Sequence, residues 1–181
     1  SFQDKKKKNI LLDYVSYPVT TAHYMERALR KTQNVFTCGA MITRELIERW
    51  NLKEMKWEVK PQDFYRGCNT SIMQVMKLLP KGWNPDLYLW IETGLDNIPP
   101  DIKELKMPKA CYLIDTHLYS DRHKEIARYF DFVFLAQKEH VEKFKAEGVK
   151  NVYWLPLGCD PEIHGKTEMP KKYDVGFVGS V

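Results

Sequence analysis

The chain has 181 residues, of which 44% are hydrophobic and 13% aromatic, a composition typical of a globular domain and not of a disordered segment. This length suffices for one α/β domain with a hydrophobic core but is too short for two complete nucleotide-binding domains. The formal net charge of +4 is concentrated in residues 1–8, which contain four consecutive lysines. We interpret residues 1–8 as a basic, flexible, solubilising tail; an arm that binds nucleic acid is the less common role of such a run.

The four cysteines of the sequence are widely separated and form no Cys-x-x-Cys pair: Cys38, Cys68, Cys111 and Cys159. This spacing argues against a zinc ribbon or a disulfide framework. Cys38 and Cys111 stand in apolar, strand-like runs and are expected to be buried thiols. No apolar run approaches the length of a membrane span, and no signal-peptide pattern opens the chain. A reducing cytoplasm is the expected location.

Apolar, strand-like runs alternate with helical stretches along the chain. We expect strands at Asn9–Val15, Asn34–Cys38, Lys56–Val59, Asp86–Ile91, Ala110–Ile114, Phe132–Leu135, Val152–Leu155 and Tyr173–Val178. We expect helices from about Thr21 onwards and at Thr43–Trp50, Asn69–Leu79, Asp121–Tyr129 and Lys138–Glu147. This order predicts an α/β, Rossmann-like, doubly wound and mostly parallel sheet.

The clearest unit runs from Asp131 to Asp160 and reads as strand, helix, strand and loop. Gly148 is expected to end the helix, because glycine adopts the left-handed conformation at little cost. Pro156 ends the second strand, because it has no N–H to donate. A strand–helix–strand unit of this length implies parallel strands and a right-handed crossover.

Ligands in open α/β sheets bind beyond the carboxyl ends of the strands. The residues that follow the expected strands are therefore candidates: Ser16, Glu92, Asp115, His117, Gln137 and Gly158. A histidine at this edge has a pKa near neutrality, suited to accepting a proton from a hydroxyl, and Asp115 would orient it or compete for that role. In the alternative interpretation Asp115 caps the following helix, His117 is an ordinary loop residue and Glu92 belongs to a turn.

The first strand–helix loop offers a second group of polar and aromatic side chains. Ser16, Tyr17 and His23, together with Tyr14, are suited to form a pocket with aromatic walls and hydroxyl groups. Alternatively, Tyr14 and Tyr17 only pack in the core. His123 and His140 stand in charged helical stretches and are expected to face solvent.

Several common motifs are absent from the sequence. It contains neither a Gly-x-Gly-x-x-Gly nor a P-loop motif, which argues against a classical dehydrogenase half or a P-loop enzyme. No Asp-x-Asp pair is present, which argues against a divalent metal held with a sugar diphosphate. The five histidines lack the spacing of a metal site.

Three runs resemble a known family: ACYLIDTH, then DFVFLAQKEHVEKFKAEGVKNVYWLPLGCDPEIH, then YDVGFVGSV. They look like the spore maturation protein B-like glycosyltransferases, which are similar to family 4 glycosyltransferases and have the two-domain GT-B fold. The resemblance covers Ala110–Val181 well, and residues 9–109 match only in the order of strands and helices. It implies metal-independent transfer of a sugar from a nucleotide-diphosphate donor to an acceptor, with no cofactor.

By this resemblance, residues 9–164 form the acceptor-side domain, and residues 165–181 a linker with the first strand of a second, donor-binding domain. His117 would be the general base or a polar group of the cleft, supported by Asp115. The acceptor would contact Ser16, Tyr17, His23, Glu92 and Gln137. The donor side would include Gly158, Asp160, Gly179 and Ser180.

The acidic donor motif of the family has no counterpart within these 181 residues, so the resemblance implies that this stretch alone is inactive and binds donor sugars weakly or not at all. The residues Tyr173–Val181 are then expected to dock on a sheet edge of their own domain or of a neighbouring copy, which would make a homodimer. The alternative function is a non-catalytic α/β binding or protein-interaction module.

Overall fold

A computed structural model describes residues 6–16, 20–41, 44–49, 51, 62–67, 69–94 and 97–165, and residues 168, 170, 172, 175 and 176. Its strands are β1 (Asn9–Asp13), β2 (Asn34–Gly39), β3 (Phe64–Tyr65), β4 (Leu87–Ile91), β5 (Lys109–Leu113), β6 (Phe132–Leu135) and β7 (Val152–Trp154). Its α-helices are α1 (Thr21–Thr32), α2 (Arg44–Arg49), α3 (Ile72–Leu78), α4 (Ser120–Ala127) and α5 (Val141–Ala146). Two short 3₁₀ helices, η2 (Ile102–Glu104) and η3 (Lys138–His140), complete the described elements.

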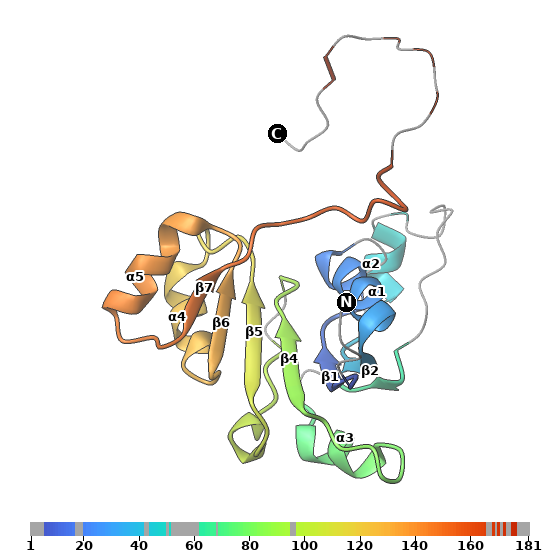
Figure 1. Ribbon diagram of the computed structural model, residues 1–181, viewed down its shortest axis with the longest axis vertical. Helices are drawn as coiled ribbons and strands as arrows, with labels where there is room; N and C mark the ends of the chain where they lie inside the picture. Colours follow the sequence, from blue (N-terminus) through green and yellow to red (C-terminus); the bar gives the residue numbers. More distant parts are fainter. Residues whose placement is uncertain are drawn as a thin grey trace.

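The strands form one seven-stranded sheet in the order β3-β2-β1-β4-β5-β6-β7, and every pairing is parallel (Figure 1). The first three strands step outwards in one direction, and the chain then returns so that β4 pairs with the other side of β1. The direction of winding therefore reverses between β1 and β4. This arrangement confirms the predicted Rossmann-like, doubly wound sheet.

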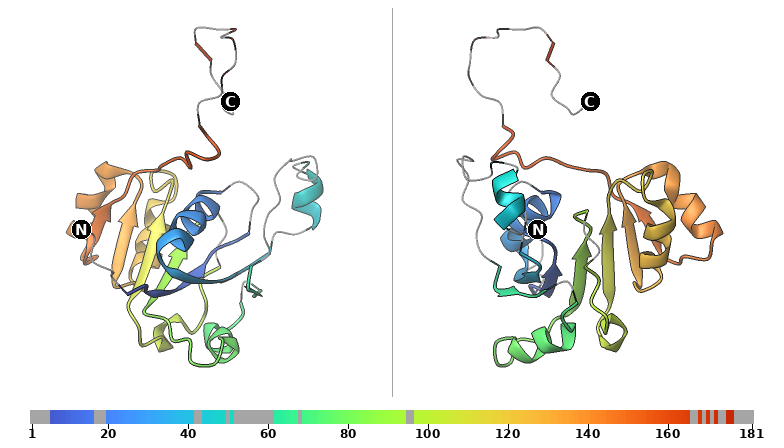
Figure 2. Two further views of the ribbon diagram at one scale, coloured as in Figure 1. Left: turned by 45° about the vertical axis from the view of Figure 1, so that its right-hand side comes forward. Right: turned by 180° about the vertical axis from the view of Figure 1, so that it is seen from behind.

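Helices lie on both faces of the sheet (Figure 2). On one face α1 packs through Ala22 and Met25 against a core that includes Leu89 and Tyr112. On the other face α3, α4 and α5 cover the second core cluster, which includes Trp90. Burial on both faces explains why the strand runs are almost continuously apolar.

The end of β2 lies unusually close to the chain that leaves β1. Gly39 has a φ of +141°, and a Cβ atom added there would stand 1.9 Å from the carbonyl oxygen of Tyr14. Only glycine fits this position, because both the space and the conformation exclude a side chain. The close approach continues as Ser16 N–H donates to the carbonyl of Ala40 at 3.0 Å.

A buried ion pair joins the end of β1 to the segment after β3. The Arg66 guanidinium donates to both carboxylate oxygens of Asp13, at 2.9 and 3.0 Å, and to the carbonyl of Asn97 at 2.6 Å. The Tyr88 hydroxyl donates to the same carboxylate at 2.7 Å. The side chains of Asp13 and Arg66 are fully buried.

Three predicted elements differ from the structure or lie wholly or partly outside the described residues. The strand predicted at Lys56–Val59 lies outside the described residues, and the strand next to β2 is β3 at Phe64–Tyr65. The helix predicted at Lys138–Glu147 is divided into η3 and α5. Most of the predicted strand Tyr173–Val178 lies outside the described residues; its two described residues, Val175 and Gly176, are not in a strand, and Val175 is 88% exposed.

None of the helices in the described part of the chain has both the length and the apolar character that crossing a membrane requires.

Candidate functional site

A pocket of about 360 Å³ opens at the carboxyl edge of the sheet, where the winding direction reverses. We call it the edge pocket. Its walls come from the N-terminal end of α1, the segment after β4 and the loop after β5. The lining residues are Thr20, Thr21, Glu92, Thr93, Gly94, Ile114, Asp115, Leu118 and Tyr119.

Two carboxylates lie in the edge pocket. Glu92 is buried and accepts a hydrogen bond from the backbone N–H of Gly94. Burial raises the pKa of Glu92 above its ordinary value, and the charge of Asp115 adds to this shift, while the amides of Gly94 and Ile114 oppose it. Asp115 is exposed and has a left-handed φ of 54°. The pocket thus combines one solvated carboxylate with one that is partly desolvated.

Threonine hydroxyls complete the polar wall of this pocket. Thr20 is the N-cap residue of α1, but its side chain makes no capping hydrogen bond. Its Oγ1 atom is buried and has no hydrogen-bond partner among the described residues. Thr93 Oγ1 accepts from the backbone N–H of Val15 at 3.4 Å. Hydroxyls and carboxylates in this arrangement are suited to bind the hydroxyl groups of a ligand.

His117 lies on the same loop as Asp115 but does not line the edge pocket. It is exposed. Burial is the main cause that lowers the pKa of His140, and Lys143 and, to a smaller extent, His117 add to this shift. Asp115 and His117 form no hydrogen bond with each other in the described structure. The carbonyl oxygen of the Gln137 side chain accepts from the backbone N–H of Thr116 at 3.2 Å, so Gln137 holds this loop in place.

The expectation that His123 and His140 face solvent is wrong, because both are buried. His123 stands three residues before Ile126, so both lie on the buried face of α4. His140 ends η3 directly before α5, four residues before the buried Phe144. His123 Nδ1 lies 3.3 Å from the hydroxyl of Thr116. Burial lowers the pKa of His123 to about 4.

The described residues of the pocket predicted around the first loop, Tyr14, Ser16 and His23, are all buried. His23 is buried, contacts the Tyr14 ring edge-on at 5.7 Å between centroids, and lies 3.9 Å from the Glu26 carboxylate. Glu26 also accepts hydrogen bonds from the Tyr14 hydroxyl and from Arg30. Ser16 is buried beside Ala40. Tyr17 lies outside the described residues.

After β7 the chain crosses the carboxyl edge to reach α1 (Figure 1). We call residues 155–164 the strap. Arg27 of α1 donates to Asp160 and to Glu162, each at 2.7 Å, and Lys31 also pairs with Glu162. Gly158 and Asp160, predicted on the donor side, both belong to the strap. Gly179 and Ser180 lie outside the described residues.

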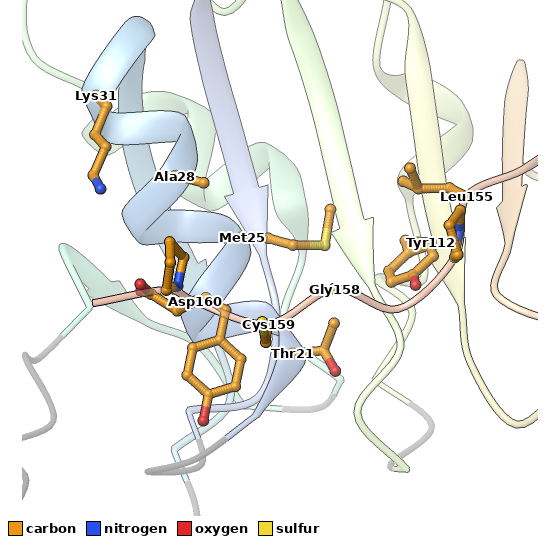
Figure 3. A pocket seen from close by; sticks show the side chains of 12 residues that line it. Thr21, Met25, Ala28, Lys31, Tyr112, Leu155, Gly158, Cys159 and Asp160 are labelled. Carbon is orange, nitrogen blue, oxygen red and sulfur yellow. The ribbon is translucent and has the colours of Figure 1, made fainter. Parts of the chain in front are cut away.

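A second cavity, of about 260 Å³, lies between the strap, α1 and β5. We call it the strap cavity. Figure 3 shows Met25 of α1 and Tyr112 of β5 directed into this space, with Gly158 and Cys159 of the strap passing across it. Thr21 lines both this cavity and the edge pocket, so the two adjoin.

The structure thus brings Glu92 and Asp115 together and places His117 and Gln137 beside them on the same edge. It engages Ser16 and His23 in packing and Asp160 in an ion pair. The role of the threonines in the edge pocket, and the strap cavity itself, were not predicted from the sequence. The pair Thr20-Thr21 at the expected start of a helix could have indicated hydroxyl groups at this edge. No group of three or more His, Cys, Asp or Glu residues within the described ranges is arranged to hold a metal ion.

No protein-family model matches this chain, and no curated protein sequence matches it.

Proposed function

We propose that this chain is the acceptor-side domain of a glycosyltransferase that uses a nucleotide-diphosphate sugar. The observation that carries the proposal is the edge pocket: two carboxylates and three threonines at the point where the winding of the sheet reverses. Pockets at such points are the usual ligand sites of doubly wound sheets. Carboxylates and hydroxyls accept and donate hydrogen bonds to sugar-like hydroxyl groups.

The reaction joins an acceptor oxygen to the anomeric carbon of the donor sugar. The bond between that carbon and the diphosphate oxygen breaks, the diphosphate leaves with its electron pair, and the acceptor hydroxyl loses its proton. In this proposal the proton passes to His117 or Asp115 of the β5 loop. Glu92 and the threonines orient the acceptor, and the strap and any residues that follow it face the donor.

The test is a transfer assay with the complete product of the gene. Labelled UDP-, GDP- and TDP-sugars are offered with a library of hydroxylated acceptors. The His117→Ala variant is expected to lower kcat by about two to four orders of magnitude if His117 is the general base. A smaller loss in His117→Ala than in Asp115→Asn assigns that role to Asp115. The matched control is Asp121→Asn, because the Asp121 side chain is 98% exposed and lies outside the pocket.

Two results would contradict the proposal. Absence of transfer from all three donor classes, in a protein that binds a hydroxylated ligand at the edge pocket, favours the alternative of a non-catalytic binding module. If sugar transfer is unchanged in both His117→Ala and Asp115→Asn, the loop after β5 takes no part in the chemical step.

A further inference from the structure

The strap cavity is lined mostly by carbon atoms. Its walls include the Met25 thioether, the Tyr112 ring, Leu155 and two prolines, Pro156 and Pro161. Burial raises the pKa of Tyr112 to about 12, which reflects the apolar surroundings of this ring. Thioether and ring surfaces of this kind make favourable contacts with aromatic groups.

The fold itself leaves this space open. Polar contacts at the rim attach the strap to α1, namely the pairs that Arg27 and Lys31 make with Asp160 and Glu162. The part of the strap above the cavity carries little bulk, and a Cβ atom added at Gly158 would meet no atom within 4 Å. Leu155 remains 38% exposed although it lines the cavity. Ion pairs therefore attach the strap beside α1, and the cavity remains open between the strap and the packed side chains of Met25 and Tyr112.

The volume of the cavity indicates the size of a ligand. An engineered apolar cavity of about 150 Å³ accepts benzene. The strap cavity, at about 260 Å³, has room for an aromatic ring with a substituent. Since Thr21 borders both spaces, such a substituent is able to continue into the edge pocket with Glu92 and Asp115.

We infer that the strap cavity binds an aromatic ring of the ligand whose hydroxylated portion occupies the edge pocket. The acceptor is then an aryl glycoside or an aromatic alcohol with a hydroxylated substituent. This inference rests on the proposed function for the identity of the ligand as an acceptor, but the cavity itself is tested by binding alone.

Cys159 provides a natural reporter for the test, because it is exposed and lines the cavity. Cys38 and Cys111 are buried, and burial raises the pKa of each thiol well above its ordinary value, so both react slowly. Replacing Cys68 by serine removes the remaining thiol. The rate of Cys159 modification by a disulfide reagent is then measured with increasing benzyl alcohol, phenyl β-glucoside or methyl β-glucoside.

We expect benzyl alcohol and phenyl β-glucoside to slow the modification at millimolar concentration, with phenyl β-glucoside at least about tenfold more effective than methyl β-glucoside. Ala28→Leu, which fills the cavity from α1, should abolish this preference. Thr32→Leu, on the same helix but outside the cavity, should preserve it. Circular dichroism and the unfolding midpoint of both variants verify that each is folded.

Equal protection by phenyl and methyl glucosides, or a preference that survives in Ala28→Leu, would overturn the inference. If benzyl alcohol and phenyl β-glucoside protect Cys159 better than methyl β-glucoside does but no sugar is transferred from any donor, the inference stands and the proposed function fails. If sugar is transferred but no aromatic compound protects Cys159, the proposed function stands and the inference fails.

Discussion

At the scale of single residues, the buried pair of Asp13 and Arg66 is the feature that we expect to tolerate substitution least. Both side chains are fully buried, and the carboxylate is satisfied by two guanidinium contacts and the Tyr88 hydroxyl. A buried pair of this kind contributes little net stability compared with an apolar pair of the same shape. Removing one partner is costly, however, because the other charge then remains buried and uncompensated.

We therefore expect Asp13→Asn to lower the free energy of unfolding by about 3–5 kcal/mol. The measurement is urea unfolding followed by circular dichroism. The matched control is Asp121→Asn, which removes a carboxylate that is 98% exposed and should change stability by less than about 0.5 kcal/mol. A loss below about 1 kcal/mol in Asp13→Asn would show that water reaches Arg66 in the variant.

The sequence did not reveal this pair, and the reason is physical. Asp13 stands in the apolar run NILLDYV, which signals a buried strand but not the partner of the acid. Arg66 is 53 residues away and follows β3, whose position was not anticipated. By contrast, the buried state of Cys38 and Cys111 was predicted correctly, because burial of a thiol needs only apolar neighbours and no partner.

At the scale of elements, ion pairs attach the strap to α1. Arg27 joins Asp160 and Glu162, and its bond to Asp160 raises the pKa of Arg27 and lowers that of Asp160. The pKa of Glu162 is lowered mainly by Lys31, with a smaller contribution from Arg27. His164 adds an edge-on contact with the Tyr24 ring, 5.2 Å between centroids. The strap therefore depends on ion pairs that salt screens.

Arg27→Ala is expected to loosen the strap without unfolding the sheet. The amides of Ile163 and His164, which donate to the carbonyl of Asp160, should exchange hydrogen about tenfold faster or more, while amides of β4 and β5 keep their protection. Native-state hydrogen exchange by NMR measures both. Arg128→Ala, at an exposed arginine on the C-terminal end of α4, is the matched control. Unchanged exchange in the strap of Arg27→Ala would show that apolar contacts hold it.

Element positions were predictable where the sequence carried both an apolar run and a stop signal. β6, α5 and β7 lie close to their expected positions, and Gly148 ends α5 with a φ of +84° as predicted. β3 was missed because a two-residue strand has no periodicity to detect. The path of the strap back to α1 was also not predictable from the sequence, because it depends on pairs between residues more than 130 positions apart.

At the scale of the whole molecule, the parallel sheet and its edge followed from the alternation of strands and helices. The edge assignment placed Glu92, Asp115, His117 and Gln137 together, because parallel strands end on the same side. Which of them share a cavity was not predictable, since this depends on side-chain direction within the loops. The buried histidines were mispredicted for a different reason: the charged residues around them masked the short apolar face of each helix.

Those buried histidines predict how global stability responds to acid. The folded-state pKa of His123 is about 4, below its ordinary value of 6.5, because burial disfavours the charged ring. Between pH 6.5 and pH 4 the unfolded chain binds a proton that the folded chain does not. Stability is therefore present above this window and is lost as the pH falls through it.

We expect the wild type to lose about 2 kcal/mol more stability between pH 7 and pH 5 than His123→Asn, which keeps a polar group near Thr116 but does not titrate. Urea unfolding at the two pH values gives the difference, and comparing variants cancels the opposite contribution of Glu92, whose pKa is raised. His164→Asn, at an exposed histidine, should behave as the wild type does. Equal acid sensitivity of wild type and His123→Asn would show that His123 titrates normally.

The central position of β1 has a consequence for synthesis on the ribosome. One side of β1 pairs with β2 soon after both emerge, but the other side must wait for β4, as in the contact of Asn9 with Asp86, 77 residues later. At about 5–20 residues per second, the apolar edge of β1 remains unpaired for roughly 4–15 seconds in each nascent chain. Open edges of this kind recruit other strands. Slow translation between residues 40 and 87 should therefore increase aggregation, and a chaperone that binds nascent chains should act in this interval.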